Sequence, residues 1–175
     1  MSERFSWALV LAGAAVAAAV TFTLLTLGAG VGLLLILPSQ ETVPQGFLTG
    51  GAIYFFVAEA FGFAAGGHVA GRLMGPMVES HVQEEIRAAI HGLAAWSVAV
   101  LAMLVLVGVA GHALATLYGA VPGLSRRTAA IASLWTAFAL LFGAVVAMVA
   151  AVTARLEDDR DSPWGLFAFH KNWRS

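Results

Sequence analysis

Residues 46–75 read GFLTGGAIYFFVAEAFGFAAGGHVAGRLMG. A helix of this length and apolar character can cross the roughly 30 Å hydrocarbon core of a bilayer. Several of its glycines lie four residues apart, which places them on one helix face and lets another helix approach backbone to backbone. The glycines expected to pack helices together lie in this stretch and in the first apolar segment: Gly28, Gly32, Gly62, Gly66, Gly67, Gly71 and Gly75.

The composition points to a membrane protein throughout. Of the 175 residues, 60% are hydrophobic and 11% are charged, whereas a soluble domain is about half apolar and about a quarter charged. The long apolar runs of this chain are apolar on every face. They therefore lack the alternation of apolar and polar residues that the strands of a β-barrel show. The sequence therefore predicts an all-α integral membrane protein, a four-transmembrane-helix bundle with small-residue packing faces. Its single domain covers residues 1–175, with spans at about 6–37, 46–73, 88–111 and 128–154.

The basic residues predict the orientation. With both termini in the cytoplasm, seven of the nine Lys and Arg residues lie on that side and two lie on the other, as positive-inside bias requires. The sequence thus favours a multi-pass membrane protein with both termini in the cytoplasm. Its last segment, 155–175, is a cytoplasmic aromatic tail suited to the headgroup zone or to docking a partner. The aromatic residues of this tail are Trp164, Phe167, Phe169 and Trp173.

Glu59 is the acidic residue near the middle of the second span. A charge at mid-bilayer costs at least ~2.5 kcal/mol on insertion scales. Since Glu59 shares a helix face with Gly62 and Gly66, we expect it to point at another helix. Three interpretations stay open at this stage. The carboxyl is protonated and hydrogen-bonded inside the bundle, or it pairs with a partner subunit, or it is the relay of a small proton or ion transporter.

Histidines suggest a second kind of site. His68 and His91 are expected near the cytoplasmic edge of consecutive antiparallel spans, where two facing histidines could ligate a haem iron. One histidine alone could hold a chlorophyll-type pigment, and a polar group satisfied by water or carbonyls is the simpler alternative. The run formed by His81, Glu84 and Glu85 lies in an expected loop, 75–89, and is typical of a solvated face. No metal site is therefore predicted.

Three patches carry a family resemblance: Ser6-Trp7 leading to the glycine run at 28–32, the stretch 66–73 (GGHVAGRL), and His91-Gly92-Leu93 with Trp96. Together they resemble small bacterial inner-membrane proteins often labelled "PhnA-like", over residues 1–110. The resemblance implies a bundle of spanning helices with a G-G-x-x-A-G-R pattern closing the second span. It implies no catalytic activity, and it implies a neutral residue where this chain has Glu59.

No hydrolase, phosphate-loop or zinc-protease motif occurs in the sequence. There is no cysteine, which excludes disulfides and thiolate chemistry, and the net charge of −1 gives no reason to expect nucleic acid as a partner. The glycine faces exceed what one four-helix bundle needs. We therefore expect a non-enzymatic accessory subunit, without cofactor, that stabilises or assembles a larger respiratory or photosynthetic membrane complex. Its partners would be the lipid bilayer and the other subunits.

Overall fold

A computed structural model describes residues 5–35, 45–75, 80–118 and 126–161. These residues form four helices: α1 (Trp7–Leu35), α2 (Gln45–Arg72), α3 (His81–Tyr118) and α4 (Arg126–Asp161). Each helix contains a segment that is long and apolar enough to cross a membrane, and no strand occurs in the described ranges. The predicted all-helical, four-helix architecture is confirmed.

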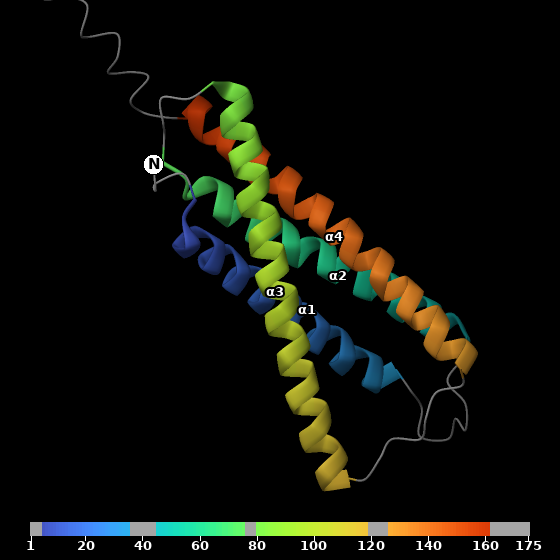
Figure 1. The fold of residues 1–175 in the computed structure, drawn as a ribbon. Helices are drawn as coiled ribbons and strands as arrows, with labels where there is room; N and C mark the ends of the chain where they lie inside the picture. The colour runs from blue at the N-terminus through green and yellow to red at the C-terminus, as the bar shows by residue number, and fades with distance from the viewer. Residues whose placement is uncertain (1–4, 36–44, 76–79, 119–125, 162–175) are drawn as a thin grey trace, which may run out of the picture.

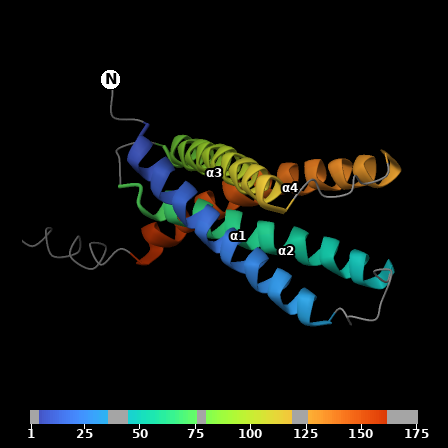
Figure 2. The ribbon, with the colours of Figure 1, turned by 90° about the horizontal axis from the view of Figure 1, so that it is seen from below.

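The helices form a bundle that is packed at one end and open at the other (Figure 1). Neighbouring helices follow the order α1, α2, α4, α3, and α2 also touches α3 across the bundle, whereas the described parts of α1 and α4 do not touch. The packed end holds the start of α1, the end of α2, the start of α3 and the end of α4. At the open end, α3 diverges from the other three helices (Figures 1 and 2).

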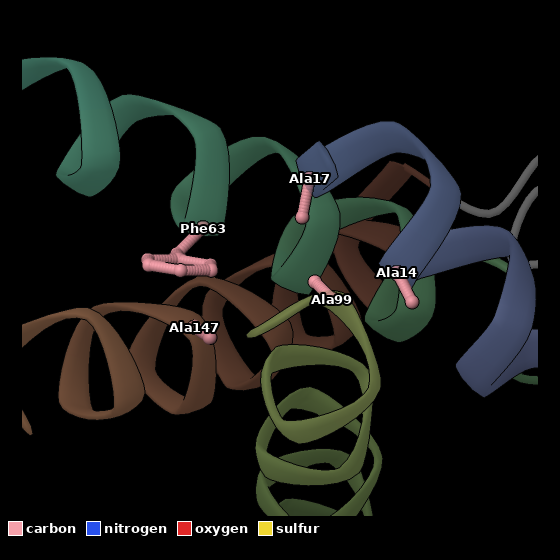
Figure 3. Close-up of a cluster of buried hydrophobic side chains, with 5 residues drawn as sticks. All are labelled: Ala14, Ala17, Phe63, Ala99 and Ala147. Carbon is pink, nitrogen blue, oxygen red and sulfur yellow. The ribbon is translucent and has the colours of Figure 1, made fainter. Parts of the chain in front are cut away.

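The interior of the bundle is built from small side chains. Of the 15 buried hydrophobic residues in the described ranges, 12 are alanines. Leucine, valine and phenylalanine side chains instead cover the outer surface. The three larger buried apolar residues are Val10, Phe63 and Met74. Phe63 lies in a cluster with Ala14, Ala17, Ala99 and Ala147 (Figure 3). An interior of small residues lets helices approach closely, and large apolar side chains on the outside suit a lipid solvent.

Two glycines of α2 face α1. A Cβ atom added at Gly66 would meet the carbonyl oxygen of Gly13 at 2.5 Å and the Cβ of Ala17 at 2.6 Å, and one added at Gly62 would collide with the hydroxyl of Thr21. The backbones of α1 and α2 are therefore in direct contact at these glycines. At Gly66 the two backbones leave no room for a side chain, and at Gly62 the space is taken by the side chain of Thr21.

Two further glycines of α2 face α4. A Cβ at Gly67 would collide with the carbonyl oxygen of Ala147, and one at Gly71 would collide with that of Ala151. Helix α2 therefore presents one pair of glycines, Gly62 and Gly66, to α1 and another pair, Gly67 and Gly71, to α4. These glycine faces are filled by helices of the same chain, so they do not exceed what one bundle needs.

The remaining predicted packing glycines differ from one another. Gly28 of α1 is covered by the ring of Tyr54, whose hydroxyl donates a hydrogen bond to the Leu24 carbonyl. Gly32 is half-buried. Gly75 has open space around it and packs against nothing in the described chain.

Helix α3 begins earlier than the sequence led us to expect. Residues 80–89 were expected to form a loop with at most one or two turns along the membrane surface, but the helix runs without a break from His81. Ser80 caps it: the Ser80 N–H donates to the side-chain oxygen of Gln83 at 3.4 Å, and the Ser80 carbonyl accepts from the N–H groups of Gln83 and Glu84. A Ser followed three residues later by Gln is a capping-box pattern.

The glycine contacts predict the effect of one added methyl group. Gly67→Ala should destabilise the bundle by about 1–3 kcal/mol, because the new Cβ has to push α4 backbone away. Gly50→Ala, on the same helix where nothing lies within 4 Å, is the matched control and should leave stability unchanged or slightly raised. Unfolding of both variants in mixed detergent micelles measures this. Equal stability of Gly67→Ala and the parent protein would contradict the packing described here.

Candidate functional site

The structure places Glu59 inside the bundle. Glu59 is 4% exposed, and its Oε2 atom is fully buried without a hydrogen-bond partner. It lies three residues before Gly62 and four before Phe63, so it shares a face with both. Glu59 therefore points toward the interior that α1, α2 and α4 enclose, and not toward the outer surface.

Thr21 of α1 is a second buried polar group without a partner. Thr21 is 0% exposed, and its hydroxyl oxygen forms no hydrogen bond. The neighbouring Thr23 and Thr26 behave differently, because they are exposed and donate to their own helix, to the carbonyls of Ala19 at 2.8 Å and Phe22 at 2.7 Å. The Thr21 hydroxyl instead lies against Gly62 of α2.

Trp96 of α3 contributes a third buried polar atom without a hydrogen-bond partner. Its indole Nε1 is buried without a partner, and its ring meets Phe63 edge to face with the centroids 6.5 Å apart. Three helices thus each present one unpartnered polar atom near the turn of α2 that holds Gly62 and Phe63.

A different polar cluster closes the packed end. Arg155 of α4 is 2% exposed, and its guanidinium forms an ion pair with Glu84 of α3 at 3.4 Å. Arg87 is buried one turn further along α3. Glu84 and Arg87, expected in the loop 75–89, and Arg155, expected at the start of the cytoplasmic tail, are therefore part of a buried charge cluster that joins α3 to α4.

His91 connects α3 to the start of α1. Its Nδ1 lies 2.8 Å from the Arg87 carbonyl oxygen and its Nε2 lies 3.1 Å from the backbone nitrogen of Ser6. Because a carbonyl accepts and an N–H donates, these two bonds assign the proton to Nδ1. The ring of Phe5 stacks on the imidazole with centroids 4.8 Å apart. In this arrangement both ring nitrogens are engaged, and neither is available to a metal.

His68 and His91 are not brought together. Gly66 faces α1 and Gly67 faces α4, and successive helix residues point about 100° apart, so His68 points away from both neighbours. His91 contacts Phe5, Ser6 and Arg87 instead. Tetrapyrrole binding by these histidines stays a prediction.

The remaining candidate ligands, His81, Glu84 and Glu85, lie at the start of α3. His81 and Glu85 are exposed whereas Glu84 is buried, so the three do not converge, and no group of three or more potential metal ligands occurs among the described residues. The predicted docking residues Trp164, Phe167, Phe169 and Trp173 lie outside the described residues.

The sequence did contain a signal for the packed-end cluster. Glu84, Arg87 and His91 are spaced by three and four residues, which puts them on one face of a helix. Combined with the capping pattern at Ser80, this spacing indicates a helix with a buried polar face. The contact between Thr21 and Gly62 of α2 could not be predicted from the sequence in the same way. Threonine is common in apolar helices, and the residue that Thr21 contacts belongs to another helix.

Comparison of the chain with protein-family models, with curated proteins and with solved structures gives no match.

The ion pair at the packed end predicts an unequal effect of two adjacent substitutions. Glu84→Ala removes a carboxylate from a buried guanidinium and should cost about 3 kcal/mol of stability. Glu85→Ala removes an exposed carboxylate and should change stability by less than about 0.5 kcal/mol. Unfolding of the two variants in detergent measures the difference. Equal effects would mean that Glu84 does not hold α3 to α4.

Proposed function

We propose that this protein is a non-enzymatic accessory subunit, embedded in a membrane by its four helices, that docks on a larger membrane complex. The observation that carries the proposal is the open end of the bundle. The glycine faces no longer support it, because α1 and α4 fill them.

The outer part of α3 has almost no contact with its own chain. Nine of the ten residues 101–110 are exposed and Met103 is half-buried. Ten residues make nearly three helical turns, so every face of this segment is exposed. The described residues 130–138 of α4 are all exposed as well, although Trp135 and Phe138 still contact Phe56 of α2.

At the open end α3 diverges from the other helices (Figure 1). In lipid, helices associate through close van der Waals packing, and the exposed faces of residues 101–110 can accept a helix of a neighbouring subunit. This arrangement supports docking, and it involves no catalytic group. The nature of the partner, respiratory or photosynthetic in our expectation, is what the experiment below identifies.

The proposed orientation puts the packed end in the cytoplasm. Arg72, Arg87 and Arg155 all belong to that end, whereas Arg126 begins α4 at the open end. This distribution supports a positive-inside placement with both termini cytoplasmic. The proposed docking surface, residues 101–110 of α3, would then lie in the outer half of the membrane.

Photo-crosslinking tests the docking proposal. A photoreactive side chain at Val105, on the diverging part of α3, should form an adduct with one defined polypeptide in the native membrane. The same probe at Leu11, which is exposed on the packed half of α1, is the matched control and should react with lipid. The captured polypeptide should also co-purify with the untreated protein in mild detergent at a fixed ratio.

Two results would refute docking at the open end. One is a lone monomer in mild detergent. The other is an adduct pattern at Val105 that contains lipid only.

A further inference from the structure

Glu59 and Thr21 lie in the last packed layer of the bundle. Ala139 of α4 and Ala99 of α3 are the corresponding final buried positions of their helices. Toward the open end beyond this layer, none of the residues whose burial is described is buried. Glu59 is therefore covered by the packed half of the bundle and adjoins the half where the helices separate.

The Thr21 hydroxyl is aimed at the turn that carries Glu59. A Cβ atom on a helix tilts toward the helix N-terminus, and the position of a Cβ at Gly62 coincides with the Thr21 hydroxyl. The hydroxyl therefore lies on the side of Gly62 that faces Ala58 and Glu59. Since Thr21 does not donate to its own helix, as Thr23 and Thr26 do, its hydrogen-bonding capacity is directed at α2.

Among the described residues, no arginine lies at the level of Glu59 along the bundle. Arg72 is 13 residues away on the same helix, which is about 20 Å along the axis. On α4, Gly143 packs on Phe63 and Ala147 on Gly67, so Ala139 lies at the level of Glu59. Arg126 and Arg155 are then 13 and 16 residues from that level, again about 20 Å or more.

The groups that contact the turn of α2 after Glu59, at Gly62 and Phe63, consequently provide hydrogen bonds but no opposite charge. They are the Thr21 hydroxyl of α1, the indole of Trp96 of α3 and Gly143 of α4. An ionised carboxylate buried without a counter-charge is strongly unfavourable. A carboxyl group that has taken up a proton is neutral and matches these surroundings.

We propose that Glu59 and Thr21 form a proton-binding site at the α1–α2 contact, in which the carboxyl carries an exchangeable proton and the Thr21 hydroxyl is its hydrogen-bond partner. The bond forms directly after a side-chain rotation or through one water molecule. Exchange transfers one proton from the carboxyl to a water molecule that enters from the open end, and leaves a carboxylate and a hydronium ion. This site is independent of the docking proposed above.

Infrared spectroscopy of the full chain in lipid vesicles tests the proposal directly. At neutral pH the parent protein should show a carboxylic-acid C=O band that Glu59→Gln removes. The band should shift when the vesicles are transferred to heavy water, because the proton exchanges. Thr21→Val keeps the shape of the side chain against Gly62 and should move the band to higher frequency, since the hydrogen bond is lost.

Thr23→Val is the matched control. Thr23 is two residues away on the same helix and its hydroxyl serves its own backbone, so the band should stay where it is in the parent protein. Thermal unfolding of each variant confirms that the spectra compare folded proteins.

Four results would overturn the proton site. The band is absent from the parent protein, which means that Glu59 is ionised. The band does not respond to heavy water, which means that its proton does not exchange. Thr21→Val leaves the band in place, which removes the hydroxyl from the site. Sodium ions at constant pH abolish the band, which assigns the site to a metal cation.

Discussion

Between α2 and its two neighbours, backbone lies against backbone, and this close approach determines how the rest of the bundle is built. Gly62 and Gly66 admit α1, while Gly67 and Gly71 admit α4. Because these contacts leave room only for small side chains, the interior consists mostly of alanine and most of the large apolar side chains are left on the outside. The one large ring in the middle, Phe63, lies over Gly143, where α4 has no side chain either.

Polar groups in this bundle occur in two places with different chemistry. At the packed end, Glu84 and Arg155 supply opposite charges, and His91 accepts a hydrogen bond from the N–H of Ser6, the residue before α1. In the last packed layer, no arginine of the described helices lies at the level of Glu59. The first arrangement fastens the helices together, and the second holds a chemical group that can change its charge.

The sequence was sufficient for the helices, because length and apolar composition are local properties of the chain. Of the glycines expected to pack, Gly62, Gly66, Gly67 and Gly71 lie in close contacts, whereas Gly75 has open space around it. The sequence failed for the start of α3, where charged residues suggested a solvated loop. Glu84 is buried because Arg155, 71 residues later, comes to meet it, and no local pattern shows that encounter. Likewise the glycine spacing predicted close contact correctly, but only the three-dimensional arrangement shows that the contacting helices belong to the same chain.

The alanine interior also bears on how the bundle assembles. An alanine side chain has no rotamers to lose, so bringing helices together through such residues requires little side-chain ordering. The leucines and phenylalanines on the outside keep their freedom among the acyl chains. Once the four helices have been inserted, their association is therefore opposed mainly by the loss of rigid-body motion of each helix, and modest dispersion attraction along the alanine contacts can drive it.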